Sequence, residues 1–190
     1  MALPQEYLYT YADLLEWEGD IRYELYGGQP RAMSSLSTIH QEILGEFHLQ
    51  FGNYLRGKKC KVYFAPFDVR LFEEPGERPE DTDTVVQPDL MVVCDPDKVD
   101  LHGVRGAPDL IIEILSESTR KLDRLIKFNL YQRSGVREYW IVDPASRTAA
   151  VYTLEEGAYH GAETYGLDAV VPVGVLEDCR IDLSAVFPER

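Results

Sequence analysis

The chain has 190 residues, of which 45% are hydrophobic and 27% are charged, and its formal net charge is −14. These values suit one globular domain over residues 1–190 and exclude a disordered chain. No apolar run approaches the roughly 20 residues that cross a bilayer, and the first residues lack the basic and apolar parts of a secretory leader, so we expect no membrane association. Three widely spaced cysteines argue against a disulfide framework or a zinc knuckle and favour a reducing cytoplasm: Cys60, Cys94 and Cys179.

The first part of the chain predicts a short helix followed by a β-hairpin. Thr10 and Asp13 resemble a capping box that opens a helix ending near residue 17. Residues 22–33 read as two strands around a Gly27-Gly28 turn. Pro30 cannot donate a ladder hydrogen bond, so the second strand is expected at a sheet edge.

A long amphipathic helix comes next. Ser37 is placed to cap it, Gly57 to end it, and its apolar stripe repeats every fourth residue at Ile39, Ile43, Phe47 and Phe51. A strand is expected over residues 60–71. The acidic stretch 72–84 contains prolines and a glycine and is expected to be an exposed loop.

Two strands with matching Pro-Asp entries follow, at residues 88–93 and 108–115. The second is apolar on both faces, which is typical of a central strand covered on both sides. Ser118 is expected to cap a helix that ends at Gly135 and carries its apolar face on Leu122, Leu125, Ile126 and Leu130. Further strands are expected at 138–143, 148–154 and 170–175. The layout predicts an α/β fold, a mixed β-sheet flanked by helices.

Glu113 lies in the middle of the apolar strand Leu110–Leu115 and is the sharpest indication of chemistry. A buried carboxylate without compensation costs several kcal/mol. A bound cation, an ion pair or protonation would each offset this cost. We favour a metal site, with a buried ion pair or an edge position as the alternative.

The position of a second metal ligand follows from side-chain alternation. Asp109 shares a strand face with Glu113 but lies about 13 Å away at roughly 3.3 Å per residue, too far to share one ion. Asp89 lies on the other strand and converges with Glu113 if the two strands pair. We therefore interpret Asp109 as a strand-entry residue that bonds the backbone, and Asp89 as a ligand for Mg²⁺ or Mn²⁺.

Three further residues are candidates for the same site. Lys127 lies on a polar stripe with Asp123 and Tyr131, where it forms either a surface ion pair with Asp123 or a charge turned toward the carboxylates. His40, near the start of the long helix, and Glu24, beside the Gly-Gly turn, are candidates that have ordinary structural roles as their alternatives.

Several motifs resemble the Uma-type family of restriction-endonuclease-like proteins, within the PD-(D/E)XK nuclease superfamily. The likeness spans about residues 10–155. It rests on Tyr23-Glu24-Leu25, Ser37 with His40, Ala65–Val69, Gln87-Pro88-Asp89-Leu90, Gly106–Leu110, Glu113–Ser116, Lys127 with Tyr131, and Gly135–Pro144.

The resemblance implies a restriction-endonuclease-like core with Asp89 and Glu113 as its two motif acids. The superfamily's usual lysine falls two residues after the glutamate, where this chain has Leu115. A lysine from the following helix, Lys127, is our candidate replacement. Nuclease folds of this kind often dimerise, so a homodimer is one arrangement that the resemblance allows.

The leading hypothesis is an endonuclease that hydrolyses DNA phosphodiester bonds with Mg²⁺ or Mn²⁺. Asp89, Glu113 and the Leu115 carbonyl would hold the metal, Lys127, Glu24 and His40 would complete the site, and Arg120, Lys121 and Arg124 would contact phosphates. Against it stands the net charge of −14, because nucleic-acid-binding proteins usually present a basic face. The alternatives are a catalytically inactive nuclease-like module that binds a protein partner, and a metal hydrolase that acts on a small phosphodiester.

Overall fold

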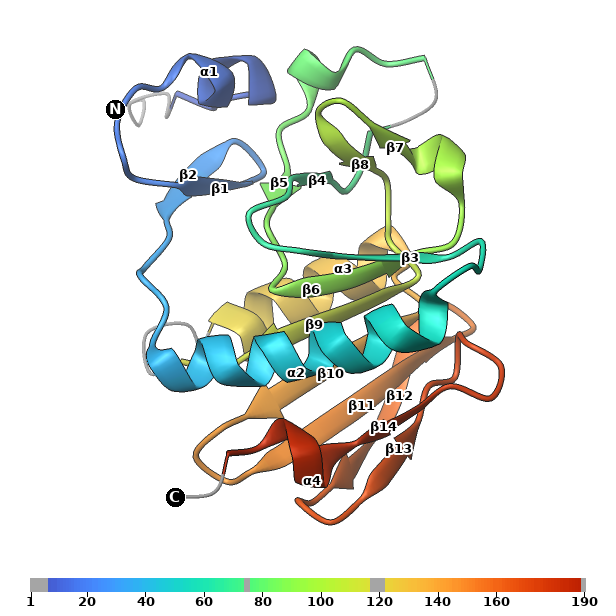
Figure 1. The fold of residues 1–190 in the computed structure, drawn as a ribbon. Helices are drawn as coiled ribbons and strands as arrows, with labels where there is room; N and C mark the ends of the chain where they lie inside the picture. The colour runs from blue at the N-terminus through green and yellow to red at the C-terminus, as the bar shows by residue number, and fades with distance from the viewer. Residues whose placement is uncertain (1–6, 74–75, 117–121, 189–190) are drawn as a thin grey trace.

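The structure, a computed structural model, describes residues 7–73, 76–116 and 122–188 and is built around a six-stranded central sheet (Figure 1). The strand order is β12-β11-β10-β9-β6-β3. Strands β9 and β10 run parallel, and the other neighbours are antiparallel. The strands are β3 (Lys61–Phe64), β6 (Leu90–Val93), β9 (Leu110–Ile114), β10 (Glu138–Asp143), β11 (Thr148–Glu155) and β12 (Ala158–Tyr165).

Two further sheets flank the central one. The first, here called the N-terminal sheet, has the order β2-β1-β5-β4-β8-β7 and lies at the top of Figure 1. Its strands are β1 (Tyr23–Tyr26), β2 (Gln29–Ala32), β4 (Val69–Arg70), β5 (Val85–Val86), β7 (Val99–Asp100) and β8 (Gly103–Arg105). The other is a two-stranded ribbon of β13 (Val170–Pro172) and β14 (Arg180–Asp182).

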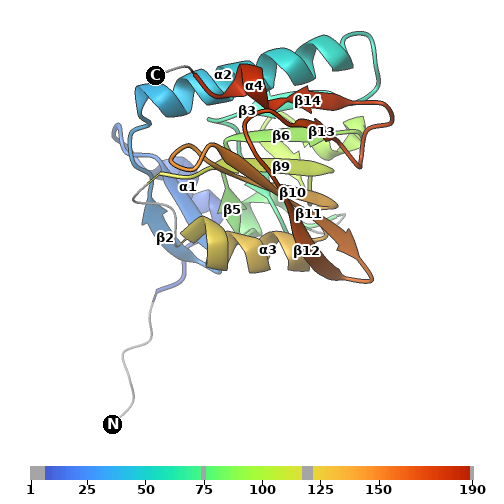
Figure 2. The same cartoon turned by 90° about the horizontal axis from the view of Figure 1, so that it is seen from below.

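Helices cover both faces of the central sheet, as Figure 2 shows for α2 (Thr38–Leu55) on one side and α3 (Phe128–Ser134) on the other. A π-helical segment, η3 (Leu122–Lys127), leads into α3. The short helices are α1 (Tyr11–Glu16), α4 (Leu183–Val186), and the 3-10 turns η1 (Pro79–Asp81) and η2 (Pro96–Lys98).

Alternation along β9 builds a separate core on each face of the central sheet. All five residues of β9 are buried. Leu110, Ile112 and Ile114 join the core beneath α2, together with Phe47 and Phe51 of that helix. Ile111 and the following Leu115 join a second core with residues of α3 and of the N-terminal sheet, so the predicted central strand is confirmed.

The early elements match the sequence-based expectations. The capping box of Thr10 and Asp13 opens α1, and the Ser37 hydroxyl accepts a hydrogen bond from the amide of His40 at the start of α2. β1 and β2 form the expected hairpin, with Pro30 on the edge strand of the N-terminal sheet. The structure thus confirms the mixed α/β architecture.

Three expectations about local structure were wrong. The single strand expected over 60–71 is split between β3 and β4, which belong to different sheets. The segment 72–84 is not wholly exposed, because Glu73, Thr82 and Thr84 are buried. Leu125 and Ile126 of η3 are exposed, because the helix turns Lys127 and Tyr131 inward instead. Strands β5, β7, β8, β12 and β14 were not anticipated.

The expectation that the cysteines stay unpaired was also wrong, since Cys60 and Cys94 form a disulfide. Antiparallel pairing of Lys61 with Val93 sets these cysteines opposite one another, one residue beyond the ladder. Cys179 is a free, buried thiol, and burial raises its pKa to about 11. Cysteine spacing therefore no longer supports an assignment of compartment.

Among the helices of the described residues, none combines the length and the hydrophobicity that a transmembrane span requires.

The packing of α2 on the central sheet yields a stability prediction. The Phe47 side chain is fully buried and meets the ring of Trp140 edge to face, with centroids 6.1 Å apart. We expect Phe47→Ala to lower the free energy of unfolding by about 3–5 kcal/mol, because it removes buried area and leaves a cavity. Leu49→Ala on the same helix, where the side chain is exposed, is the control and should change it by less than about 0.5 kcal/mol. Urea denaturation measures both, and equal losses would show that α2 packs differently.

Candidate metal centre

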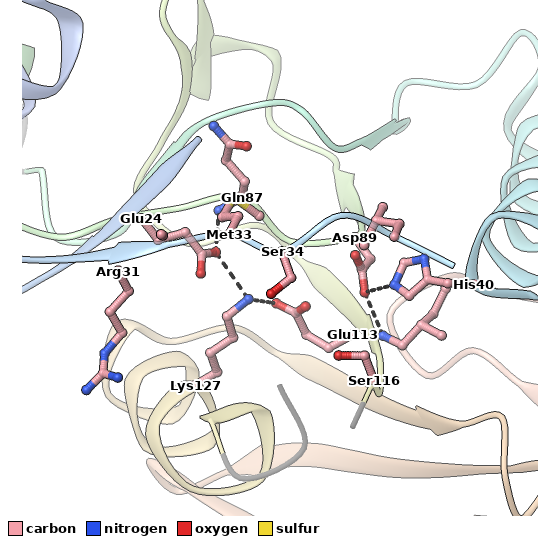
Figure 3. A pocket seen from close by; sticks show the side chains of 13 residues that line it. Glu24, Arg31, Met33, Ser34, His40, Gln87, Asp89, Glu113, Ser116 and Lys127 are labelled. Atoms are coloured by element: carbon pink, nitrogen blue, oxygen red, sulfur yellow. Dashed lines mark hydrogen bonds and ion pairs between the residues drawn. The ribbon is translucent and has the colours of Figure 1, made fainter. Parts of the chain in front are cut away.

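Asp89 and Glu113 lie on neighbouring strands and face the same pocket. β6 and β9 are antiparallel, and Leu90 lies opposite Ile112. Extending this register by one residue, back along β6 and forward along β9, sets Asp89 opposite Glu113. Both side chains point to the face of the central sheet that carries α3 and the N-terminal sheet. The structure therefore brings together the two acids that the sequence singled out, and both line one pocket (Figure 3).

Asp89 is fixed by two hydrogen bonds to the same carboxylate oxygen. His40 Nε2 lies 3.0 Å from Asp89 Oδ2, and the amide of Ile114 donates to Oδ2 at 2.7 Å. His40 reaches this position because Ser37 starts α2 three residues earlier. The other ring nitrogen of His40, Nδ1, is buried and has no hydrogen-bond partner among the described residues.

The Lys127 ammonium lies between two carboxylates that come from different sheets. Its Nζ is 2.8 Å from Glu113 Oε1 on β9 and 3.1 Å from Glu24 Oε1 on β1. Burial alone lowers the pKa of Lys127, but the charges of Glu113 and Glu24 outweigh it and hold the pKa well above its ordinary value. Lys127 is therefore a fixed positive charge at neutral pH and cannot serve there as a general base.

Two tyrosines complete this cluster. Tyr131 on α3 donates to Glu113 Oε1 at 2.6 Å, and Tyr26 on β1 donates to Glu24 Oε2 at 2.5 Å. Burial is the main cause that raises the pKa of each phenol, so both remain protonated donors. The backbone amide of Gln87 donates a third hydrogen bond to Glu24, at 2.8 Å from Oε1. Sequence reasoning missed Tyr26 and Gln87; alternation along β1, which sets Tyr26 on the face of Glu24, was the available indication for the tyrosine.

The pocket has a volume of about 200 Å³ and is bounded on one side by the segment between β2 and α2. Figure 3 shows Met33 and Ser34 of that segment between Glu24 and Asp89, whereas the Arg31 guanidinium points away from the carboxylates. Ser116, just after β9, lies on another wall. None of these four residues was predicted as part of the site. For Arg31, Met33 and Ser34, nothing in the local pattern of 31–36 indicates what the segment faces.

The other predicted site residues have different outcomes. Leu115 does not line the pocket: its amide donates to the Val142 carbonyl at 2.8 Å, so its backbone faces β10 and its carbonyl is turned away from Asp89. Arg120 and Lys121 lie outside the described residues, as does the side chain of Arg124. Asp109 accepts from the amide of Cys94 at 2.7 Å, as expected of a strand-entry residue.

The donor atoms fit a hard divalent cation that keeps much of its water. Within the described ranges no group of three or more His, Cys, Asp or Glu side chains is arranged to hold a metal. Mg²⁺, however, is usually bound by one or two carboxylates with waters and substrate phosphate, and two carboxylates converge here. The Ile114 backbone points its amide at Asp89, and its carbonyl lies toward the same side because both groups of a strand residue point one way. It is therefore the backbone ligand candidate in place of Leu115.

Comparison with known proteins gives three similarities. A family model described as Uma2, "Putative restriction endonuclease", matches residues 10–184. A Synechocystis sp. protein described as "Uncharacterized protein slr1290" is 29% identical over 152 residues, which cover 78% of this chain and 72% of that protein. The crystal structure of a "putative nuclease belonging to DUF820" from Anabaena variabilis superposes with a TM-score of 0.73 at 18% identity, covering 94% of this chain and 97% of that one. At this identity the structural likeness shows the fold.

The Lys127 arrangement predicts a strong dependence of stability on one ammonium group. We expect Lys127→Met to lower the free energy of unfolding by about 3–5 kcal/mol, because it leaves the buried carboxylates of Glu24 and Glu113 without their shared counter-ion. Lys59→Met, at an exposed position after α2, is the control and should be nearly neutral. Chemical denaturation at neutral pH measures both. A Lys127→Met protein as stable as the control would mean that the ion pairs contribute little.

Proposed function

The chain belongs to the Uma2 family of "putative restriction endonucleases", and on this premise we propose that it hydrolyses DNA phosphodiester bonds with Mg²⁺ or Mn²⁺ as cofactor. The observation that carries the proposal is the meeting of Asp89 and Glu113 in one pocket, with the Lys127 ammonium bonded to Glu113. Acids on adjacent strands with a lysine beside them suit phosphodiester hydrolysis, in which negative charge develops on the phosphate.

The metal ligands in this proposal are Asp89, Glu113 and the carbonyl of Ile114. A bound divalent cation supplies a water of lowered pKa and stabilises charge on the phosphate. His40 and the Ile114 amide both bond Oδ2 of Asp89, so they hold this oxygen in place, and Oδ1 would be the oxygen offered to a cation. His40 is thus a positioning residue.

Lys127 acts as a charge rather than as a base. Because its pKa stands well above the ordinary value, its ammonium donates hydrogen bonds toward the attacking water or a phosphate oxygen. Glu24 and Tyr131 do not touch the substrate in this scheme. Glu24 anchors the lysine from the N-terminal sheet, and Tyr131 orients Glu113 from α3.

Phosphate contacts by Arg120, Lys121 and Arg124, and a homodimer that addresses two strands, stay predictions. All three basic residues belong to the connection between β9 and α3, which starts beside the pocket at Ser116.

The second candidate is a catalytically inactive module that binds a protein partner. It is favoured by Leu115 at the usual lysine position and by the net charge of −14. The third is a hydrolase of small phosphodiesters, favoured by the modest volume of the pocket. Activity on bis(p-nitrophenyl) phosphate without DNA cleavage would select the third.

Mn²⁺-dependent nicking of plasmid DNA tests the proposal. We expect the purified protein to nick, Glu113→Gln to reduce the rate at least about 100-fold, and Asp89→Asn to do the same, because each removes a ligand charge. Asp109→Asn is the matched control, since Asp109 also follows a proline at the start of a strand, as Asp89 does, but does not line the pocket. Equal nicking by Glu113→Gln would reveal a contaminating nuclease. Calorimetry that finds no Mn²⁺ binding at millimolar concentration would favour the inactive module.

A further inference from the structure

The pocket is closed on one side by a chain segment that is fixed at both ends. This wall, residues 31–36, begins in β2 and ends at Ser37, the cap of α2. The Met33 amide donates to the Arg22 carbonyl at 2.8 Å, which ties the wall to the residue just before β1. Figure 3 shows Met33 and Ser34 of this wall beside Glu24 and Glu113. Residues 31–36 therefore form one side of the space that a substrate would occupy at the acids.

The reactive groups are recessed behind the wall. Asp89 is 8% exposed, Glu113 3% and Lys127 4%. The pocket of about 200 Å³ is smaller than the 300–1,000 Å³ of typical small-molecule sites. It has room for one phosphate with part of its sugar, and not for the width of a double helix.

We infer that this site takes a single nucleic-acid strand, either free or locally unpaired, and discriminates against an intact duplex; the inference rests on the proposed nuclease function. A duplex resists bending over lengths of about 150 base pairs, so bringing one of its phosphates sharply into a recess costs deformation free energy. A single strand lacks this stiffness, because its backbone torsions are not held by pairing. Duplex substrate must first unpair locally, which costs free energy and slows its capture.

Charge favours the same substrate. A duplex laid along the protein would bring many phosphates against a chain of net charge −14, whereas a single strand entering one pocket brings few. Arg31 is exposed at the pocket mouth, opposite Glu24 in the β1–β2 register, with its guanidinium 5.8 Å from the Tyr26 ring centre. Arg31 lines the pocket and has no ion pair within the described part of the chain, so its guanidinium is available to bind a phosphate outside the pocket, next to the one at the carboxylates.

The experiment compares one fluorescent 30-nucleotide strand, the same strand in a duplex, and the duplex with an unpaired flap. With Mn²⁺ we expect kcat/KM for the single strand and the flap to exceed that for the duplex at least about tenfold. Equal or faster cleavage of the duplex would overturn the inference while leaving the nuclease function intact.

Binding with Ca²⁺ in place of Mn²⁺ separates this inference from the proposed function. If no substrate is cleaved, the nuclease proposal fails, and fluorescence anisotropy still tests strand selection: at least tenfold tighter binding of the single strand supports it, and equal affinities overturn it. Arg31→Ala should weaken single-strand binding at least about fivefold. Arg180→Ala, an exposed arginine on β14, is the matched control and should bind as the wild type does.

Discussion

The ammonium of Lys127 between Glu24 and Glu113 is the interaction on which the rest of the structure depends. It joins a strand of the N-terminal sheet, a strand of the central sheet and η3. Two buried carboxylates and a buried lysine are each costly to bury alone, and together they offset one another only in this geometry. Tyr26 donates a further hydrogen bond to Glu24 and Tyr131 donates one to Glu113. The cluster therefore specifies how the N-terminal sheet packs against the central sheet.

Asp89 is organised by the same principle with different partners. Its oxygen Oδ2 takes bonds from the start of α2 and from the strand that carries Glu113, so two layers of the fold converge on it. Function and architecture are coupled here, because the contacts that hold helices against the sheet also orient the acids. The wall of residues 31–36 belongs to this coupling, since it connects Glu24's hairpin to His40's helix and thereby shapes access to the pocket.

The helix after β9 illustrates how tertiary structure can override a local pattern. Apolar periodicity favoured burial of Leu125 and Ile126, yet both are exposed while Lys127 and Tyr131 are buried. Burying the lysine is favourable only because its ammonium pairs with the buried carboxylates of Glu24 and Glu113. Both partners lie on distant strands, so the helix sequence alone does not indicate them. The sequence offered two interpretations of Lys127, and the choice between them required the partners.

The sequence by itself determined the elements with strong local patterns: the capped helix α2, the Gly-Gly hairpin, the buried strand β9, and Asp89 and Glu113 as acids in unusual surroundings. Periodicity, capping and turn chemistry act over a few residues and can be read from them. Only the tertiary structure decided that residues 60–71 divide between two sheets, that Cys60 meets Cys94, that the Leu115 backbone faces β10, and that residues 31–36 wall the pocket. These features depend on which distant strands pair and in which register, and long-range pairing leaves no periodic trace in a single chain.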